Sequence, residues 1–143
     1  MFFRLGSALL KGRLIGCLIY IGEGDTQSFE LANNWSFIFK ELINEIIDFS
    51  GNKEMPFIFA QLASITDSRK SRKKHSYKAW EYLKDIQNKI SIKNTSMICT
   101  DDLELKDDGL HLNTDSQREL AKRFYDAYIS SFFYKNIFIN DYK

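Results

Sequence analysis

The sequence predicts a three-layer α/β sandwich built on a mostly parallel β-sheet. Short apolar runs at 14–21, 56–63 and 95–100 alternate with longer segments in which apolar residues recur every three or four positions. Strands that alternate with helices need crossover connections, which favour parallel strands with helices on both faces. The chain of 143 residues contains 44% hydrophobic residues and one proline, which suits a single domain with a substantial core.

The first half of the chain is expected to form a helix, a strand, a second helix and a second strand. A helix ends at about 7–11, and the continuous apolar run at 14–21 predicts a strand buried on both faces. One apolar stripe then runs along a helix from 31 to 49, and Gly51 is a natural C-terminal stop. The run at 56–63 predicts a second buried strand with its proline at the edge.

The second half is expected to add a helix, a short strand and a last helix. Ser76 is the predicted start of the first of these helices, after a solvated stretch at 64–75. A third strand is predicted at 95–100, and the capping-box spacing that begins at Thr114 predicts the start of the last helix. Residues 134–143 are expected to form an aromatic tail of this single domain, 1–143.

The charge balance argues against nucleic-acid and membrane partners. Twenty Lys and Arg against nineteen Asp and Glu leave a formal charge of +1, and the cationic run at 69–75 contains no aromatic residue, which is typical of a solvated loop. The longest uncharged apolar run, 14–21, is far shorter than the ~20 residues that span a bilayer. The N-terminus has no signal-peptide pattern, so a cytoplasmic location follows if Met1 is the genuine start.

No metal or cofactor is expected. Cys17 and Cys99 lie in apolar runs as buried free thiols, and the chain contains no CxxC or HxxxH spacing. A calcium loop around Gly109 would place Lys106 where a carboxylate belongs. A dinucleotide fingerprint starting at Gly22 would need a third glycine where Gln27 stands.

The segment Asp108-Gly109-Leu110-His111 is the sharpest chemical signal. A carboxylate three residues before a histidine, across a glycine turn, can accept from Nδ1 and leave Nε2 to take a proton from a nucleophile. The same pattern also fits an ordinary Asp-Gly turn with a solvated histidine. Because parallel strands end at one edge of a sheet, we expect three loops to lie together there: the turn at 22–25, the loop with Gln61 and Ser64, and the loop at 101–111.

Four segments, taken in order, resemble the sialate O-acetylesterase-like branch of the SGNH hydrolases, a family of carbohydrate acetylesterases. The likeness runs from about residue 9 to residue 128. The matching segments are GCLIYIGEGD at 16–25, MPFIFAQL at 55–62, WEYLKDIQ at 80–87 and DGLH at 108–111.

The resemblance implies a flavodoxin-like SGNH hydrolase fold and removal of acetyl groups from sugar hydroxyls through a serine acyl-enzyme. It implies an acetylated carbohydrate as substrate, and neither a metal nor a cofactor. By the same resemblance, His111 is the general base and Asp108 orients it, while Gly22 and Glu23 belong to the loop beside the oxyanion hole.

The sequence departs from the family pattern at two places. No segment matches the G-Q-S-N block that carries the nucleophile, and Ser7 precedes the first strand where the family has a helix. Ile21 stands where the family has a glutamine before Gly-Glu. The chain therefore resembles the C-terminal portion of the domain without its nucleophile strand, and is expected to be inactive alone. An exposed sheet edge would then favour homo-oligomers or pairing with the missing N-terminal segment.

Two other functions stay open. A non-catalytic α/β module could bind a carbohydrate or a protein at the same sheet edge, with His111 as polar lining. A phospho-accepting receiver domain also has acidic loops there, but no lysine ends a later strand of this chain.

Overall fold

The computed structural model describes residues 2–65 and 77–140, and the side chains of 3–65 and 77–131. The cationic run at 69–75 and the predicted helix start at Ser76 lie outside these ranges. The elements are α1 (Phe2–Leu9), β1 (Cys17–Ile19), the 3₁₀ helix η1 (Glu23–Gln27), α2 (Phe29–Ser50), β2 (Phe57–Ala60), α4 (Trp80–Lys89), β3 (Thr95–Ile98) and α5 (Thr114–Asn140).

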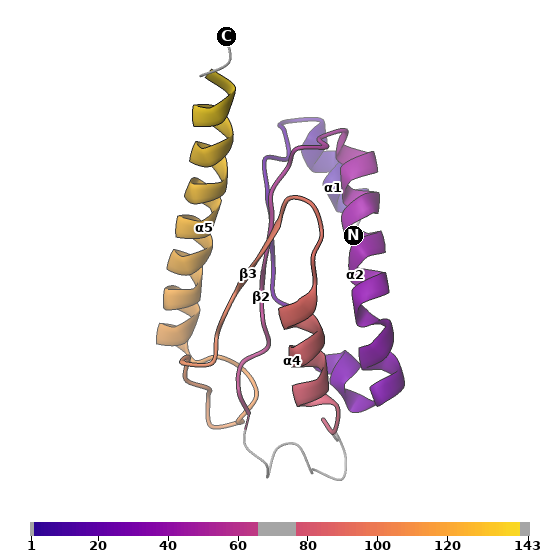
Figure 1. Cartoon of the computed structure of the whole chain (residues 1–143), viewed down its shortest axis with the longest axis vertical. Helices are drawn as coiled ribbons and strands as arrows, with labels where there is room; N and C mark the ends of the chain where they lie inside the picture. Colours follow the sequence, from indigo (N-terminus) through magenta and orange to yellow (C-terminus); the bar gives the residue numbers. More distant parts are fainter. Residues whose placement is uncertain (1, 66–76, 141–143) are drawn as a thin grey trace.

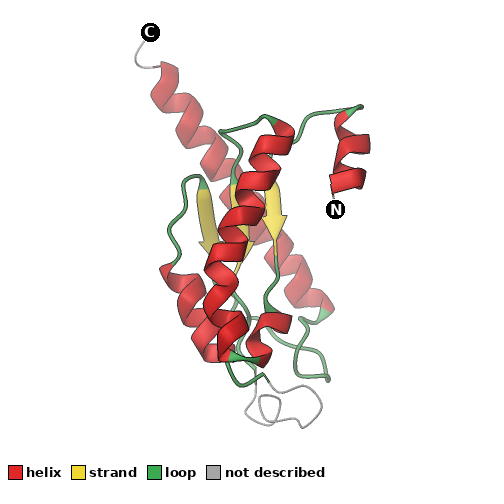
Figure 2. Cartoon of the chain, turned by 90° about the vertical axis from the view of Figure 1, so that its right-hand side faces the viewer, coloured by secondary structure: helices red, strands yellow, loops and turns green. Residues whose placement is uncertain are grey.

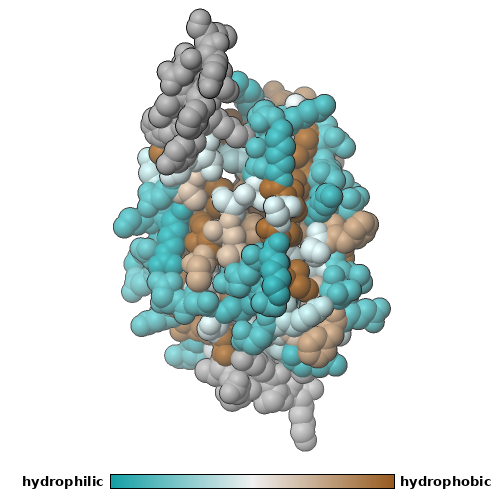
Figure 3. Space-filling view, viewed as in Figure 1, coloured by the Kyte–Doolittle hydropathy of each residue, from teal (hydrophilic) through white to brown (hydrophobic). Residues whose placement is uncertain are grey.

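The sheet has the order β1-β2-β3, and both strand pairs are parallel. Helices α2 and α4 cover one face of the sheet and α5 covers the other, while α1 lies beside the edge formed by β1 (Figure 1 and Figure 2). The predicted three-layer α/β sandwich with a parallel sheet is therefore confirmed. Figure 3 shows apolar side chains between the helices, over the edge formed by β3, with polar side chains around them.

Two apolar clusters hold the layers together, one on each face of the sheet. Trp35 and Phe39 of α2 stack with ring centroids 4.6 Å apart, and Phe39 meets Phe59 of β2 edge-on at 5.1 Å. On the other face, Ile58 packs with Phe124 of α5. Strand β2 is buried on both faces because it lies between two strands and two helix layers, as the sequence predicts.

Strand β1 differs from the prediction that it is buried on both faces. Cys17 and Ile19 pack toward the α2 side, but Leu18 points to the other face and is 55% exposed. Helix α5 lies mainly against β2 and β3, so Leu18 stays more than half exposed. The edge position of β1 therefore explains the difference.

Three further details of the helices differ from the sequence prediction. Asn113, not Thr114, caps α5, because its Oδ1 accepts from the amide of Ser116 at 2.8 Å. Helix α4 begins at Trp80. Helix α5 runs to Asn140, so residues 134–140 continue a helix where a tail was predicted. No helix in the described ranges combines the length and apolar character that crossing a membrane requires.

Candidate functional site

The loop between β3 and α5 folds back on itself around Asp108. Oδ1 of Asp108 accepts hydrogen bonds from the backbone amides of Leu110, at 2.8 Å, and His111, at 3.0 Å. Gly109 has φ 66°, a left-handed conformation that glycine adopts without steric cost, and its amide donates to the Lys106 carbonyl at 2.8 Å. An aspartate that bonds the backbone two residues on, followed by glycine, forms this turn from local sequence alone.

Asp108 and His111 form a hydrogen-bonded pair. Nδ1 of His111 lies 2.7 Å from Oδ2 of Asp108. The His111 ring and the two backbone amides hold the pKa of the Asp108 carboxyl well below its usual range, so Asp108 is ionised near neutral pH and accepts the Nδ1 proton. In the described part of the chain no side chain is hydrogen-bonded to Nε2, which leaves this nitrogen as a proton acceptor that faces outward from the pair.

The loop that carries this pair is fixed at both ends. Arg123 of α5 contacts Asp102 through two hydrogen bonds of 2.8 and 2.6 Å and also donates to the Cys99 carbonyl at 3.1 Å. The guanidinium lowers the pKa of Asp102 to about 2. Ser116 accepts from the amide of Glu104 at 2.8 Å. These contacts hold the loop between β3 and α5, so the position of His111 does not depend on the short turn alone.

The turn after β1 is built around Gly22. Its φ is 135°, and a Cβ at this position would lie 3.2–3.4 Å from the side chains of Leu83, Gln87 and Trp35. Gln87 also donates to the Ile21 carbonyl at 3.4 Å. Only glycine therefore fits between β1 and the two covering helices, and η1 begins at the next residue.

The turn at 22–25 and the histidine share one pocket. This pocket has a volume of about 320 Å³, and Glu23, His111 and Tyr20 line it. Its remaining walls come from Leu112, Gln117, Leu120, Ala121 and Phe124. The structure thus brings Glu23 and the Asp108–His111 pair to the same carboxyl-terminal edge of the sheet. Gly22 does not line the pocket and packs against the helices beneath the turn. The catalytic roles that the resemblance implies for these four residues stay predictions.

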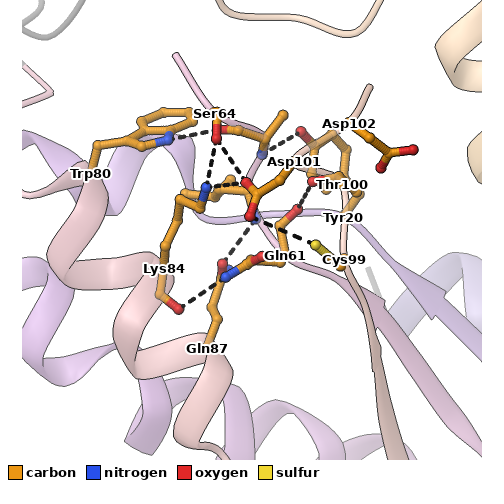
Figure 4. A network of polar contacts seen from close by, with 12 residues as sticks. Tyr20, Gln61, Ser64, Trp80, Lys84, Gln87, Cys99, Thr100, Asp101 and Asp102 are labelled. Carbon is orange, nitrogen blue, oxygen red and sulfur yellow. Dashed lines mark hydrogen bonds and ion pairs between the residues drawn. The ribbon is translucent and has the colours of Figure 1, made fainter. Parts of the chain in front are cut away.

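A second polar network lies on the same edge, where the sequence pattern predicts Ser64 and Asp101 but assigns no role to Lys84. The buried ammonium of Lys84 donates to Ser64 Oγ at 3.0 Å and forms an ion pair with Asp101, and Ser64 donates to Asp101 at 2.7 Å (Figure 4). Lys84 lowers the pKa of the Asp101 carboxyl. The only sequence signal for Lys84 itself is its position four residues after Trp80, on the buried face of α4.

This network ties α4 to the ends of β2 and β3. Gln87 accepts from the amide of Leu62 at 2.9 Å, and Gln61 donates to the Lys84 carbonyl at 3.3 Å. Lys84 donates to the Ser64 hydroxyl, and that hydroxyl donates to the Asp101 carboxylate, so both hydrogen-bonding directions of Ser64 are used within the network. Ser64 is therefore part of a structural contact and is not poised as a nucleophile.

Neither Ser7 nor either cysteine belongs to the pocket. Ser7 donates to the Phe3 carbonyl within α1 at 3.1 Å, and α1 lies at the amino-terminal end of the sheet, opposite the loop of His111 (Figure 1). The prediction of buried cysteines was wrong for Cys99, which is exposed, while Cys17 is half-buried, and both are free. The described residues contain no group of three His, Cys, Asp or Glu side chains able to hold a metal ion.

Comparison with known proteins identifies the family of the chain. A family model described as "Carbohydrate esterase, sialic acid-specific acetylesterase" matches residues 1–130. The chain belongs to this carbohydrate esterase family. The family resemblance predicted from the four sequence segments is thereby confirmed.

A solved structure shares the fold of this carbohydrate esterase chain. It is the X-ray structure of a protein from Arabidopsis thaliana, with 23% sequence identity and a TM-score of 0.75. The match covers 90% of this chain and 50% of that one, so the esterase chain spans about half the length of the plant protein. A search of curated proteins found no match.

Proposed function

We propose that this carbohydrate esterase domain provides the histidine and aspartate of a Ser-His-Asp site for acetyl esters on sugars, as in SGNH hydrolases. The observation that carries the proposal is the 2.7 Å contact between His111 Nδ1 and Asp108 Oδ2, with His111 beside Glu23 in one pocket. An ionised carboxylate on Nδ1 selects the tautomer whose Nε2 accepts a proton, which a general base requires.

In the proposed reaction, a serine hydroxyl attacks the acetyl carbonyl carbon and its proton passes to His111 Nε2. The carbonyl oxygen carries the negative charge of the tetrahedral intermediate until the bond to the sugar oxygen breaks and His111 returns the proton to that oxygen. Water then hydrolyses the acetyl-serine by the same route and releases acetate. Asp108 stays ionised throughout and stabilises the imidazolium.

Gly22 and Glu23 are proposed to border the oxyanion hole. The positive φ of Gly22 turns the chain sharply after β1, so that Glu23 lines the pocket at the start of η1. Ile21 supplies no side-chain donor where the family has a glutamine. Loss of one such donor typically reduces the rate by ~10²–10³.

The nucleophile is proposed to come from outside this chain, through pairing at the open edge of β1. No serine lines the pocket of His111 within the described residues. In the described sheet, strand β1 has a neighbour on one side only, and Leu18 and Ile15 are 55% and 57% exposed beside its open edge, as expected if a further segment of the domain packs there. An N-terminal segment of the domain is the partner that this edge would accept.

The missing serine also favours a second candidate, a non-catalytic module that binds carbohydrate in the same pocket. Nitrogen chemical shifts of the His111 ring distinguish the catalytic site from the binding module. For the catalytic site, Nδ1 of the neutral ring carries the proton in the wild type, and Asp108→Asn shifts the two ring nitrogens toward a mixture of tautomers.

Ring shifts of His111 that are the same in the wild type and in Asp108→Asn would contradict the catalytic proposal and favour the binding module.

A further inference from the structure

Tyr20 is the one phenol in the pocket of His111, within the part of the chain that the structure describes. It directly follows β1, and it lines the pocket together with Glu23 and His111. Its hydroxyl lies at the carboxyl ends of the strands, beside the backbone of the loop after β2 (Figure 4). Tyr20 also packs against the apolar clusters on both sides of the sheet.

The hydroxyl of Tyr20 has an unused hydrogen. Its oxygen accepts from the amide of Ala63 at 3.4 Å, and within the described residues it donates to no acceptor. Burial, together with the nearby Glu23 carboxylate, raises the pKa of Tyr20 to about 12. The phenol therefore keeps its proton at any physiological pH and has an O–H hydrogen to donate to a ligand in the pocket.

The pocket combines a few polar side chains with apolar walls. Leu112, Leu120 and Phe124 are buried and line the side formed by α5 and the loop before it. A volume of about 320 Å³ takes a small group. An acetyl ester has a matching division, because its methyl group is apolar and its carbonyl oxygen accepts hydrogen bonds.

We propose that the Tyr20 hydroxyl donates a hydrogen bond to the carbonyl oxygen of a bound acetyl ester, while the methyl group contacts Leu112, Leu120 and Phe124. This inference rests on the proposed function and deepens it. Tyr20 thereby supplies the side-chain donor that Ile21 cannot, from the neighbouring position in the chain. It makes the pocket selective for the acetylated over the free sugar.

The test is a titration of the whole chain with 9-O-acetylated sialic acid and with the same sugar lacking the O-acetyl group. NMR signals of the pocket residues give both dissociation constants. Tyr20→Phe should weaken binding of the acetylated sugar about 2- to 12-fold, the usual range for one neutral hydrogen bond, and leave the free sugar unchanged. A merely structural role would change both constants equally.

Tyr82→Phe is the matched control. The Tyr82 hydroxyl bonds Asn33 at 3.1 Å, and Tyr82 is not among the residues that line the pocket, so both constants should stay at wild-type values. The inference is overturned if Tyr20→Phe leaves the preference for the acetylated sugar intact.

His111→Ala distinguishes this failure from failure of the proposed function. If His111→Ala weakens binding and Tyr20→Phe does not, only the assignment of Tyr20 is wrong. A wild-type chain that does not bind the acetylated sugar more tightly than the free sugar overturns both.

Discussion

Lys84 shows how one buried charge organises the carboxyl-terminal edge of the sheet. Its side chain is 8% exposed, and its ammonium bonds Ser64 and Asp101 from two different strand ends. A lysine on the apolar face of a helix is compatible with burial only when a carboxylate pairs with it. The partner comes from a distant part of the chain, so no local pattern indicated it.

Replacing Asp101 with asparagine is expected to destabilise the fold at pH 7, because the buried ammonium loses its charged partner. Lys84 lowers the pKa of Asp101, so this contribution is present above the ordinary pKa of an aspartate, about 3.9, and is lost as pH falls through the lower pKa of the folded state. Urea unfolding at several pH values should show the wild type and Asp101→Asn converging in acid.

Asp85→Asn is the control for this prediction. Asp85 pairs with Lys89 at 2.6 Å on the exposed surface of α4, where such pairs contribute only about 0.3–0.5 kcal/mol. A loss of stability in Asp101→Asn no greater than in Asp85→Asn would contradict the role of the buried ion pair.

At the scale of elements, the turn between β1 and η1 depends on a single glycine. Gly22→Ala should destabilise the chain by about 1–3 kcal/mol, because alanine is strained at φ 135° and its Cβ would press on Leu83 and Trp35. The free energy of unfolding in urea measures this.

Gly24→Ala, two residues away, is the matched variant. A Cβ at Gly24 meets nothing within 4 Å, so a change within about 0.5 kcal/mol is expected. Equal changes in the free energy of unfolding for Gly22→Ala and Gly24→Ala would show that the turn does not require a glycine at position 22.

The start of α5 gives a second test at this scale. Asn113→Ala should reduce stability by about 0.5–2 kcal/mol, since its Oδ1 caps the Ser116 amide at 2.8 Å. Thr114→Ala should change the free energy of unfolding by less than about 0.5 kcal/mol, although the sequence pattern names Thr114 as the cap. A larger loss of stability in Thr114→Ala than in Asn113→Ala, measured by thermal or urea unfolding, would show that Thr114 is the cap.

Helix α2 is predicted correctly as a helix, but the predicted buried face is only partly right. The predicted stripe contains Trp35 and Ile46, which are buried, but also Leu31, Ile38 and Phe49, which are 46%, 56% and 45% exposed. The buried face is completed by Ala32, Phe39 and Ile43. Both stripes have helical spacing, and only contact with β2 and α4 selects between them.

At the scale of the whole molecule, the pocket and α1 lie at opposite ends of the sheet. The purified chain is therefore expected to show no serine-dependent hydrolysis of an aryl acetate such as 4-nitrophenyl acetate, because no serine lines the pocket of His111 in the described chain. Release of 4-nitrophenol measures the rate, with Ser7→Ala and Ser64→Ala as comparisons. Robust turnover that either substitution abolishes would mean that the nucleophile lies within this chain.

The sequence alone determined the kinds and order of the elements and the local chemistry of the Asp108–His111 turn. Both follow from interactions between residues near in sequence: hydrophobic periodicity, turn residues, and a side chain that bonds the backbone two and three positions on. The family also followed from these segments, because their order and spacing are properties of the chain.

Tertiary structure alone decided which face of α2 is buried, that β1 lies at an edge with Leu18 exposed, and that Lys84 meets Asp101. It also placed Tyr20 and Glu23 in one pocket with His111, although Tyr20 and His111 are 91 positions apart in the sequence. These contacts join positions far apart in sequence, so they depend on how the layers pack and not on any local pattern.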